Sequence, residues 1–403
     1  MIISEKLSIA VVVQGRFHAF DLARELLSQG HEVFVFTNYP RYAVARFGFP
    51  QNRVRSFLLH GLLDRFFWTL YRWFACPYPE RWMHESFGRW ASKELMKDPW
   101  DILHVFSGVA EEIFDSSAIH CRLKTLVRGS AHIVTQSRIL SDEADRTGRF
   151  VESPSAWMIA REKREYEKAE RIIVLSTFAL KSFLEQGVPE HKLMVIPLGA
   201  QISHFRPSER IIQERCRRVL SGDPLRVLMV GTFSFQKGAY DLCRIASEAG
   251  PRFSFRFVGA VDPSATSLRR GAKGITFVSK KDQFKLPLVY EWADLFIFTT
   301  LHDGYAVVIA QAQAAGLPVL TTGNSCGPDL LREGLTGWVL PIRSFQAFVD
   351  RLQWCETHRE EVAKMVMEIY SHFIPRDWSH VAEDFVAQTH VCLNKKKEPI
   401  SYA

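Results

Sequence analysis

The sequence predicts an α/β protein of two Rossmann-like domains, each a doubly wound parallel sheet, that face each other across a cleft. Three observations lead to this fold class. At 403 residues the chain is too long for one ordinary hydrophobic core. Short apolar strands alternate with helical segments through the first half, which is typical of a parallel sheet covered by helices. The same alternation restarts near residue 226.

The first half begins with an apolar run at residues 7–13, which we expect to be a strand. The run is short and stops at Gln14-Gly15-Arg16, which favours a buried strand over a signal peptide. A helix is expected at 17–29, with Gly30 ending it. Further strands of this half are expected at residues 33–37, 101–106, 125–128 and 171–175.

Residues 195–207 contain prolines and glycines and mark the junction between the halves. The strands of the second half are expected at residues 226–231, 253–259, 275–278, 295–299 and 319–322. A last helix is expected at 377–390, after Pro375. The expected division is therefore a first domain at 1–200, a second at 201–375, and a helix with a basic tail at 376–403.

The composition excludes several classes of protein. Hydrophobic residues make up 47% and charged residues 24%, which are globular values. The seven cysteines are scattered, without a Cys-x-x-Cys pair, so we expect a reducing cytosol and neither disulfides nor zinc. The net charge of +7 fits an anionic donor or an anionic membrane surface. Nucleic acid is not expected as a partner, because no nucleic-acid-binding motif is present.

Residues 303–319 are the most informative stretch. They predict an acidic loop at Asp303, a buried helix that begins at about Tyr305, and a Gly-x-Pro turn into the strand at 319–322. Unpaired amides at the start of a helix, with the helix dipole, suit a phosphate group. Gln311 is expected about two turns into this helix, on the face that looks back at the loop.

This stretch resembles the donor-binding segment of the retaining GT-B glycosyltransferases of family 4. Their pattern is two glutamates separated by seven residues and followed by Ala-x-Ala-x-Gly-x-Pro-Val. Asp303 and Gln311 stand here in place of the two glutamates. The resemblance implies the GT-B fold and a terminal helix that crosses back onto the first domain. It also implies retaining transfer of a sugar from a nucleotide diphosphate sugar to a glycan or a lipid-linked acceptor, in polysaccharide or glycolipid synthesis.

The resemblance assigns roles to individual residues. Lys237 would neutralise the leaving diphosphate, Asp303 would hold hydroxyls of the donor sugar, and His132 would contact that sugar. Thr232 stands where the family usually has an arginine, so one expected cation is missing. The expected donor-binding residues are Gly15, Gly231, Thr232, Gly304, Tyr305, Ala306 and Gln311.

Plainer interpretations of these residues stay open. Asp303 could serve only as a helix N-cap, a role that aspartate fills well, and His132 could be a structural histidine. His104 is expected to be a sheet residue, whereas Arg16 and His18 could face the acceptor. The replacements at positions 232, 303 and 311 motivate a second hypothesis, a non-catalytic GT-B protein that binds a sugar nucleotide or a glycan.

A metal ion or another cofactor is not expected. No Asp-x-Asp pair occurs in the sequence, so the usual carboxylates for a magnesium-bound diphosphate are missing. The resemblance implies the same, with Lys237 and helix dipoles in place of the metal. No P-loop, Gly-x-Gly-x-x-Gly or Ser/His/Asp order supports a kinase, a dehydrogenase or a hydrolase.

Residues 57–90 combine many aromatic and leucine side chains with arginines. The segment is too short and too charged to span a bilayer, but its composition suits an interface. Two interpretations remain, a helix packed in the first domain and a surface for a membrane or a lipid acceptor. We expect a cytoplasmic protein, with the inner membrane surface as a possible partner through residues 57–90.

Overall fold

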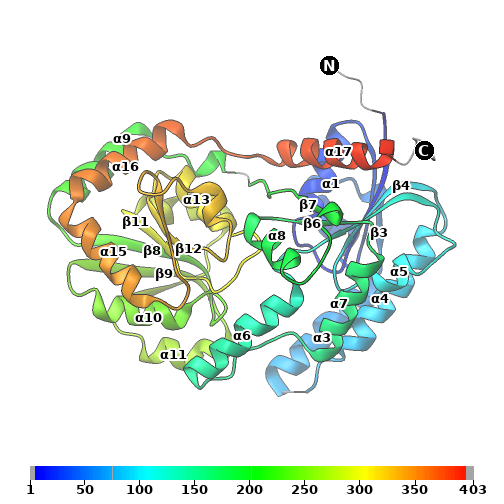
Figure 1. Ribbon diagram of the computed structural model, residues 1–403, viewed down its shortest axis with the longest axis horizontal. Helices are drawn as coiled ribbons and strands as arrows, with labels where there is room; N and C mark the ends of the chain where they lie inside the picture. The colour runs from blue at the N-terminus through cyan, green and yellow to red at the C-terminus, as the bar shows by residue number, and fades with distance from the viewer. Residues whose placement is uncertain (1–4, 75, 201, 396–403) are drawn as a thin grey trace.

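The computed structural model describes residues 5–74, 76–200 and 202–395. Within these residues the chain forms two parallel sheets, of seven and six strands (Figure 1). The strand order is β3-β2-β1-β4-β5-β6-β7 in the first sheet and β10-β9-β8-β11-β12-β13 in the second. Both orders reverse direction once, between β1 and β4 and between β8 and β11, as in doubly wound folds. The predicted fold class is confirmed.

The first sheet is built from nearly continuous apolar runs, because helices cover both of its faces. The predicted strands are present, and β3 and β7 at the two edges, three residues each, were not predicted. Its strands are β1 (Ser8–Val13), β2 (Glu32–Thr37), β3 (Val54–Ser56), β4 (Trp100–Phe106), β5 (Cys121–Val127), β6 (Arg171–Val174) and β7 (Leu193–Val195). His104 lies in β4, where it is buried and its Nδ1 is 3.1 Å from Thr125 Oγ1. It is a sheet residue, as expected.

The second sheet has the same construction, and the edge strand β13 was not predicted. Its strands are β8 (Leu225–Phe233), β9 (Phe253–Val261), β10 (Ile275–Ser279), β11 (Leu295–Phe298), β12 (Val319–Thr322) and β13 (Gly337–Leu340). β7 ends at Val195 and β8 begins at Leu225, so the chain passes from one sheet to the other between them. The expected domain boundaries at 200 and 375 stay predictions.

Helices of the first half cover both faces of the first sheet. They are α1 (Ala19–Ser28), α2 (Arg41–Ala45), α3 (Leu58–Phe74), α4 (Glu80–Leu95), α5 (Glu111–Phe114), α6 (Ile133–Thr147), α7 (Ala156–Lys168) and α8 (Thr177–Leu184). The helix predicted at 17–29 begins two residues later, because Phe17 has a positive φ of 41°. The predicted segment 57–90 is divided between α3 and α4.

Helices of the second half surround the second sheet in the same way. They are α9 (Glu209–Leu220), α10 (Ala239–Glu248), α11 (Thr266–Gly271), α12 (Leu286–Glu291), α13 (Val307–Ala314), α14 (Gly327–Leu330), α15 (Phe345–Thr357) and α16 (Arg359–His372), and the chain then continues into α17 (Trp378–Lys395). None of the helices in the described ranges combines the length and the apolar character that a membrane crossing requires.

The last helix, α17, leaves the second half and packs on α1 of the first (Figure 1). Gln29 Nε2 donates to the carbonyl of Ser379 at 3.0 Å, and Gln388 Nε2 donates to the carbonyl of Val195 at 3.1 Å. The expected crossover is confirmed, and the helix ends at Lys395 instead of residue 390. The basic tail at 396–403 lies outside the described residues.

Candidate functional site

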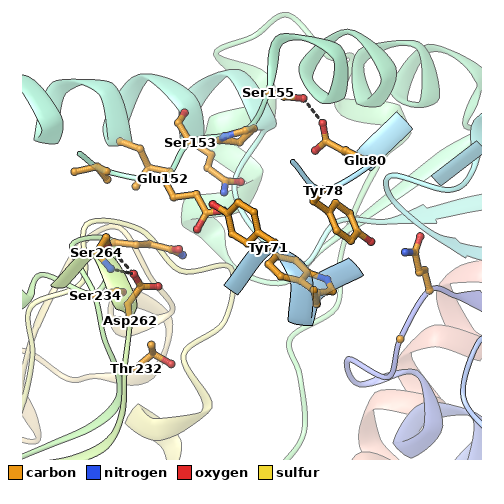
Figure 2. Close-up of a pocket in the computed structure, with 18 of the residues that line it drawn as sticks. Tyr71, Tyr78, Glu80, Glu152, Ser153, Ser155, Thr232, Ser234, Asp262 and Ser264 are labelled. Carbon is orange, nitrogen blue, oxygen red and sulfur yellow. Dashed lines mark hydrogen bonds between the residues drawn. The ribbon is translucent and has the colours of Figure 1, made fainter. Parts of the chain in front are cut away.

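A cavity of about 910 Å³ opens between the two sheets, and we call it the cleft cavity. From the first half, Gly15 and Ser107 reach it from the ends of β1 and β4. From the second half, Thr232 and Lys237 reach it from the end of β8. The cavity therefore lies at the strand-order reversals, where open α/β sheets bind their ligands. Figure 2 shows part of it.

Lys237 and Asp303 form an ion pair beside this cavity. Lys237 follows β8, and its backbone amide donates to the carbonyl of Ser234 at 3.1 Å in a tight turn. The turn directs Lys237 Nζ to 2.6 Å from Asp303 Oδ2. The two side chains are 21% and 18% exposed, so the pair is only partly desolvated. The structure brings together two of the three residues to which the sequence assigned a catalytic role.

The loop after Asp303 differs from the prediction. Asp303 Oδ1 accepts a hydrogen bond from the amide of Tyr305 at 3.2 Å, which closes a turn of the kind that aspartate favours. α13 begins at Val307 with Ala306 as its N-cap residue. The predicted start at about Tyr305 is therefore wrong, and Asp303 is not the helix N-cap. Tyr305 and Ala306 are buried, and neither is among the residues that line the cleft cavity.

Gly304 fits a close contact between the two halves. A Cβ atom at this position would lie 2.2 Å from the carbonyl oxygen of Gly129, so any larger residue would push the 302–304 loop off the first half. Next to it, Ser130 Oγ lies 3.3 Å from His302 Nδ1. The two loops that the sequence placed at the site are thus in direct contact.

His302 was missed by the sequence reasoning, and its position directly before Asp303 was the only signal. Its side chain is fully buried, and its Nε2 lacks a hydrogen-bond partner among the described residues. Burial, followed by the charges of Lys237 and Arg128, lowers the pKa of His302 to about 3. The imidazole is therefore neutral at physiological pH, and it adds no charge beside Lys237.

Gln311 uses its carbonyl oxygen inside the second half. Gln311 Oε1 accepts a hydrogen bond from the hydroxyl of Tyr290 at 2.9 Å, and Tyr290 is fully buried. Gln311 is the fifth residue of α13, a little more than one turn into the helix, and not two turns as predicted. It does not line the cleft cavity.

Gly231 lies within β8 and does not leave the strand as predicted. It pairs with Gly259 of β9, and both have positive φ values, of 151° and 156°. A Cβ atom on Gly231 would meet nothing within 4 Å, so the backbone is open to a ligand on that side. Thr232 follows it, exposed, in the lining of the cavity.

The loop after β1 is held by the end of β2. The amide of Gly15 donates to Asn38 Oδ1 at 2.8 Å, so this amide is already used within the first half. Arg16 places its guanidinium 3.8 Å from the ring centroid of Phe47. His18 packs against Phe106 and Trp378. Gly15 lines the cleft cavity, whereas Arg16 and His18, which could have faced an acceptor, do not.

His132 is not brought to the cavity. It is the N-cap of α6, and its Nδ1 accepts a hydrogen bond from the amide of Val134 at 3.2 Å. Its ring packs between Tyr166 and Phe183, with centroids 4.9 Å and 5.0 Å away. These contacts give His132 the structural role that the sequence left open.

One wall of the cavity was not predicted. Asp64, Trp68 and Tyr71 of α3, with Tyr78 before α4, line it from the first half. Figure 2 shows Tyr71 and Tyr78 on one side of the cavity and Thr232, Ser234 and Asp262 on the other. Sequence reasoning marked residues 57–90 as an interface but did not place any of them in the cleft.

No group of three or more His, Cys, Asp or Glu side chains that could hold a metal ion occurs in the part of the chain that the structure describes. The expectation of a metal-independent site stays a prediction.

Two family models match the chain. Residues 16–204 match the model described as Glycosyltransferase Family 4, and residues 224–357 match the model described as Glycosyl transferases group 1. These two segments contain the reversal between β8 and β11 and all of the residues that line the cleft cavity except Gln14 and Gly15.

Curated relatives are similar over part of their length. The D-inositol 3-phosphate glycosyltransferase of Nocardia farcinica is 24% identical over 238 residues, which cover 55% of this chain and 52% of that protein. The amylovoran biosynthesis glycosyltransferase AmsK of Erwinia amylovora is 25% identical over 218 residues, 51% of this chain and 52% of that protein. The chain thus spans about half the length of the curated relatives it matches.

Solved structures share the fold over nearly the whole chain. The Anabaena protein Alr3699/HepE in complex with UDP superposes with a TM-score of 0.67, covering 96% of this chain and 100% of that one at 15% identity. The sucrose-phosphate synthase of Thermosynechococcus elongatus has a TM-score of 0.71, covering 97% and 100% at 18% identity. Both similarities concern the fold.

Proposed function

Because the chain belongs to the group 1 glycosyltransferases of the GT-B fold, we propose that it transfers a sugar from a nucleotide diphosphate sugar to a glycan or a lipid-linked acceptor. The transfer retains the anomeric configuration and uses no metal ion. The observation that carries this proposal is Lys237, which lines the cleft cavity between the two halves and is held 2.6 Å from Asp303.

The chemistry requires a cation where the leaving group departs. The bond between the sugar C1 and the diphosphate oxygen breaks, a bond from C1 to the acceptor oxygen forms, and the acceptor proton passes to the leaving phosphate. Lys237 stabilises the negative charge that develops on that phosphate. Because the reaction takes place between two domains, closure around the donor excludes water and limits hydrolysis.

The nucleotide is proposed from the related structures. The Anabaena protein that shares this fold was solved with UDP and with UDP-glucose, so UDP-sugars are the first donors to test. The relative named for amylovoran biosynthesis supports a role in polysaccharide synthesis.

We further propose that α3 attaches the protein to the inner face of the cytoplasmic membrane. One face of α3, which we call the outer face, carries Leu59, Leu62, Phe66 and Trp73. These side chains are 64%, 53%, 55% and 75% exposed. Exposed leucines and aromatics on one helix, with the basic residues Arg65, Arg81 and Arg89 nearby in the chain, suit an anionic membrane surface.

A thermal-shift screen against UDP-, GDP-, ADP- and TDP-sugars tests donor binding. A true donor raises the melting temperature when its concentration exceeds its dissociation constant. Release of the nucleotide in the presence of an acceptor then tests turnover. If a broad panel of sugar nucleotides gives neither binding nor release, the proposal is wrong.

A second candidate is a GT-B protein that binds a sugar nucleotide without turnover. Gln311 Oε1 already accepts a hydrogen bond from Tyr290, and Asp303 is paired with Lys237, so the two residues that stand in place of the family's glutamates are satisfied by the protein itself. A variant with Thr232→Arg, Asp303→Glu and Gln311→Glu tests it. An inactive wild type whose turnover is restored in this variant supports the binding protein, and an active wild type excludes it.

A further inference from the structure

We propose that the first-half wall of the cleft cavity binds a neutral saccharide, and that this saccharide is the acceptor of the reaction. Three rings of this wall, Trp68, Tyr71 and Tyr78, are called the aromatic wall. The inference rests on the proposed glycosyl transfer and goes beyond it, because it names the chemical class of the acceptor.

The aromatic wall is a connected surface inside a hollow. The ring centroid of Trp68 lies 4.9 Å from that of Tyr78 and 5.7 Å from that of Tyr71. Trp68 and Tyr71 nevertheless remain 48% and 41% exposed, although both line the cavity. Aromatic rings present a negative face, which attracts the C–H groups on the apolar face of a sugar ring, and tyrosine and tryptophan add a polar edge. Such a surface suits a flat, uncharged and hydroxylated ligand.

The spacing of residues on α3 separates this wall from the outer face of the helix. Asp64, Trp68 and Tyr71 follow one another at intervals of four and three residues, so they share one face. Leu59, Leu62, Phe66 and Trp73 share the opposite face by the same spacing. The two faces of one helix thus serve two different environments, the cleft and the outside of the molecule.

Carboxylates beside the aromatic wall are positioned to accept hydrogen bonds from hydroxyl groups. Tyr78 donates its hydroxyl to Asp64, and Ser155 donates its hydroxyl to Glu80 Oε2 at 2.5 Å (Figure 2). Each bond uses one oxygen of its carboxylate and orients the group. Figure 2 shows Glu152 reaching towards Tyr71 from the other side.

The charge of the first-half side of the cavity selects against an anionic acceptor. The described lining of the cavity carries four carboxylates (Asp64, Glu80, Glu152 and Asp262) and one lysine, Lys237, which is already paired with Asp303. Burial and nearby Arg161 lower the pKa of His84 to about 4, so this lining histidine is neutral. These carboxylates disfavour an acceptor of the same sign, whereas the diphosphate of the proposed donor would lie beside Lys237 on the second-half side.

The test measures binding of the full-length protein to an array of immobilised neutral oligosaccharides and matched oligosaccharides that contain uronic acid. Neutral glycans are expected to bind at least about tenfold more tightly than their acidic counterparts. The double variant Glu80→Gln with Glu152→Gln is expected to reduce the difference in affinity between neutral and acidic glycans. Trp68→Ala is expected to weaken neutral binding about tenfold, whereas Trp73→Ala, on the opposite face of the same helix, leaves it unchanged.

Binding of the nucleotide sugar is measured in parallel, which separates this inference from the proposed function. If no neutral glycan binds while a nucleotide sugar still does, the inference is wrong and the proposed transfer stands. The inference is also wrong if acidic glycans bind as tightly as neutral ones, or if Trp68→Ala and Trp73→Ala have the same effect. If the wild type binds neither a neutral glycan nor a nucleotide sugar, the proposed function itself is wrong.

Discussion

At the scale of single residues, the Lys237–Asp303 pair sets the electrostatics of the site. The two groups are about four-fifths buried and their charged atoms lie 2.6 Å apart. Asp303 fixes the lysine in one geometry, so the ammonium group is oriented before any donor arrives. The same carboxylate also competes with a diphosphate for Lys237. Both effects make the lysine a sensitive point for mutation.

Lys237→Ala is expected to lower turnover by about 10²–10³, as removal of one preoriented transition-state donor does elsewhere. The melting temperature should change little, because Lys237 supports little of the core. Nucleotide release and thermal melting measure the two quantities. Lys280→Ala, an exposed lysine of the same half, is the control. Unaltered turnover in Lys237→Ala would remove this residue from the mechanism.

His132 predicts a dependence of stability on pH. Burial, followed by the charges of Arg128 and Lys163, lowers its pKa from 6.5 to about 4. The unfolded chain therefore binds this proton at a higher pH than the folded protein does. The stability contributed by the neutral histidine is complete above pH 6.5 and is lost as the pH falls towards about 4. At about pH 5 the loss is about 2 kcal/mol.

His132→Asn is expected to reduce the drop in melting temperature between about pH 7.5 and about pH 5. Asparagine keeps an oxygen that can accept from the Val134 amide, so the helix cap is retained, but it does not titrate. The same substitution at the exposed His120 should leave the drop as it is in the wild type. An identical drop in all three proteins would show that His132 does not titrate as described.

At the scale of elements, α3 and α4 are neighbours in the chain with different surroundings. α4 buries Phe87, Ala91 and Leu95 against the first sheet, as an amphipathic helix does. On α3 the leucines and aromatics of the outer face remain exposed. For α4, the interpretation of residues 57–90 as packed core therefore holds. For α3, the interpretation as an interface stays open.

Phe66→Ser with Trp73→Ser is expected to lower binding to vesicles that contain anionic phosphatidylglycerol by at least about tenfold, because two exposed aromatic rings no longer insert. Vesicle flotation measures this, and a salt-resistant fraction should disappear in the variant. The fold should survive, since Phe66 and Trp73 are 55% and 75% exposed. Phe284→Ser, at a site 87% exposed on the second half, is the control. Equal binding of all variants would contradict membrane attachment through α3.

The sequence predicted those elements whose signal is local. Long buried strands such as β1 and β8 appear as continuous apolar runs and were found, whereas β3 and β7 are too short for any run to appear. The start of α13 was placed too early, because Gly304 belongs to a contact with Gly129 that no local pattern reveals. The cleft wall on α3 was missed for the same reason, since only tertiary packing decides which face of a helix meets the cavity.

At the scale of the whole molecule, the contacts that join the two halves beside the cleft include two sets among the described residues. The first joins the loops at 129–130 and 302–304. The second is an ion network between α6 and the second half. Arg146 donates to both carboxylate oxygens of Asp241 at 2.8 and 2.9 Å and to Glu143 at 2.7 Å. Arg343 donates to Glu143 at 3.3 Å and to the carbonyl of Ile139 at 2.6 Å.

The ion network has the features expected of contacts that stabilise a single arrangement of the two halves. Asp241 and Glu143 are buried, and a buried carboxylate that loses its cation is strongly destabilised. Arg343 adopts a positive φ of 60°, which a non-glycine residue sustains only where its contacts impose it. Breaking the Arg146–Asp241 and Arg343–Glu143 pairs should therefore open the cleft and leave each sheet intact, because these two pairs lie between the halves and not within either core.

Asp241→Asn with Arg343→Gln is expected to raise the radius of gyration by about 1 Å, from about 21 Å for a compact chain of this length. The variant is also expected to bind the donor about tenfold more weakly. Part of the free energy of donor binding is then needed to close the cleft. Small-angle scattering and calorimetry measure the two effects. Arg252→Gln, which breaks the Arg252–Glu356 pair within the second half, should alter neither. A variant that stays compact and binds the donor as the wild type does would show that the network does not control closure.

A saturating donor should return the open variant to the wild-type radius of gyration, because a ligand that prefers the closed form shifts the population towards it.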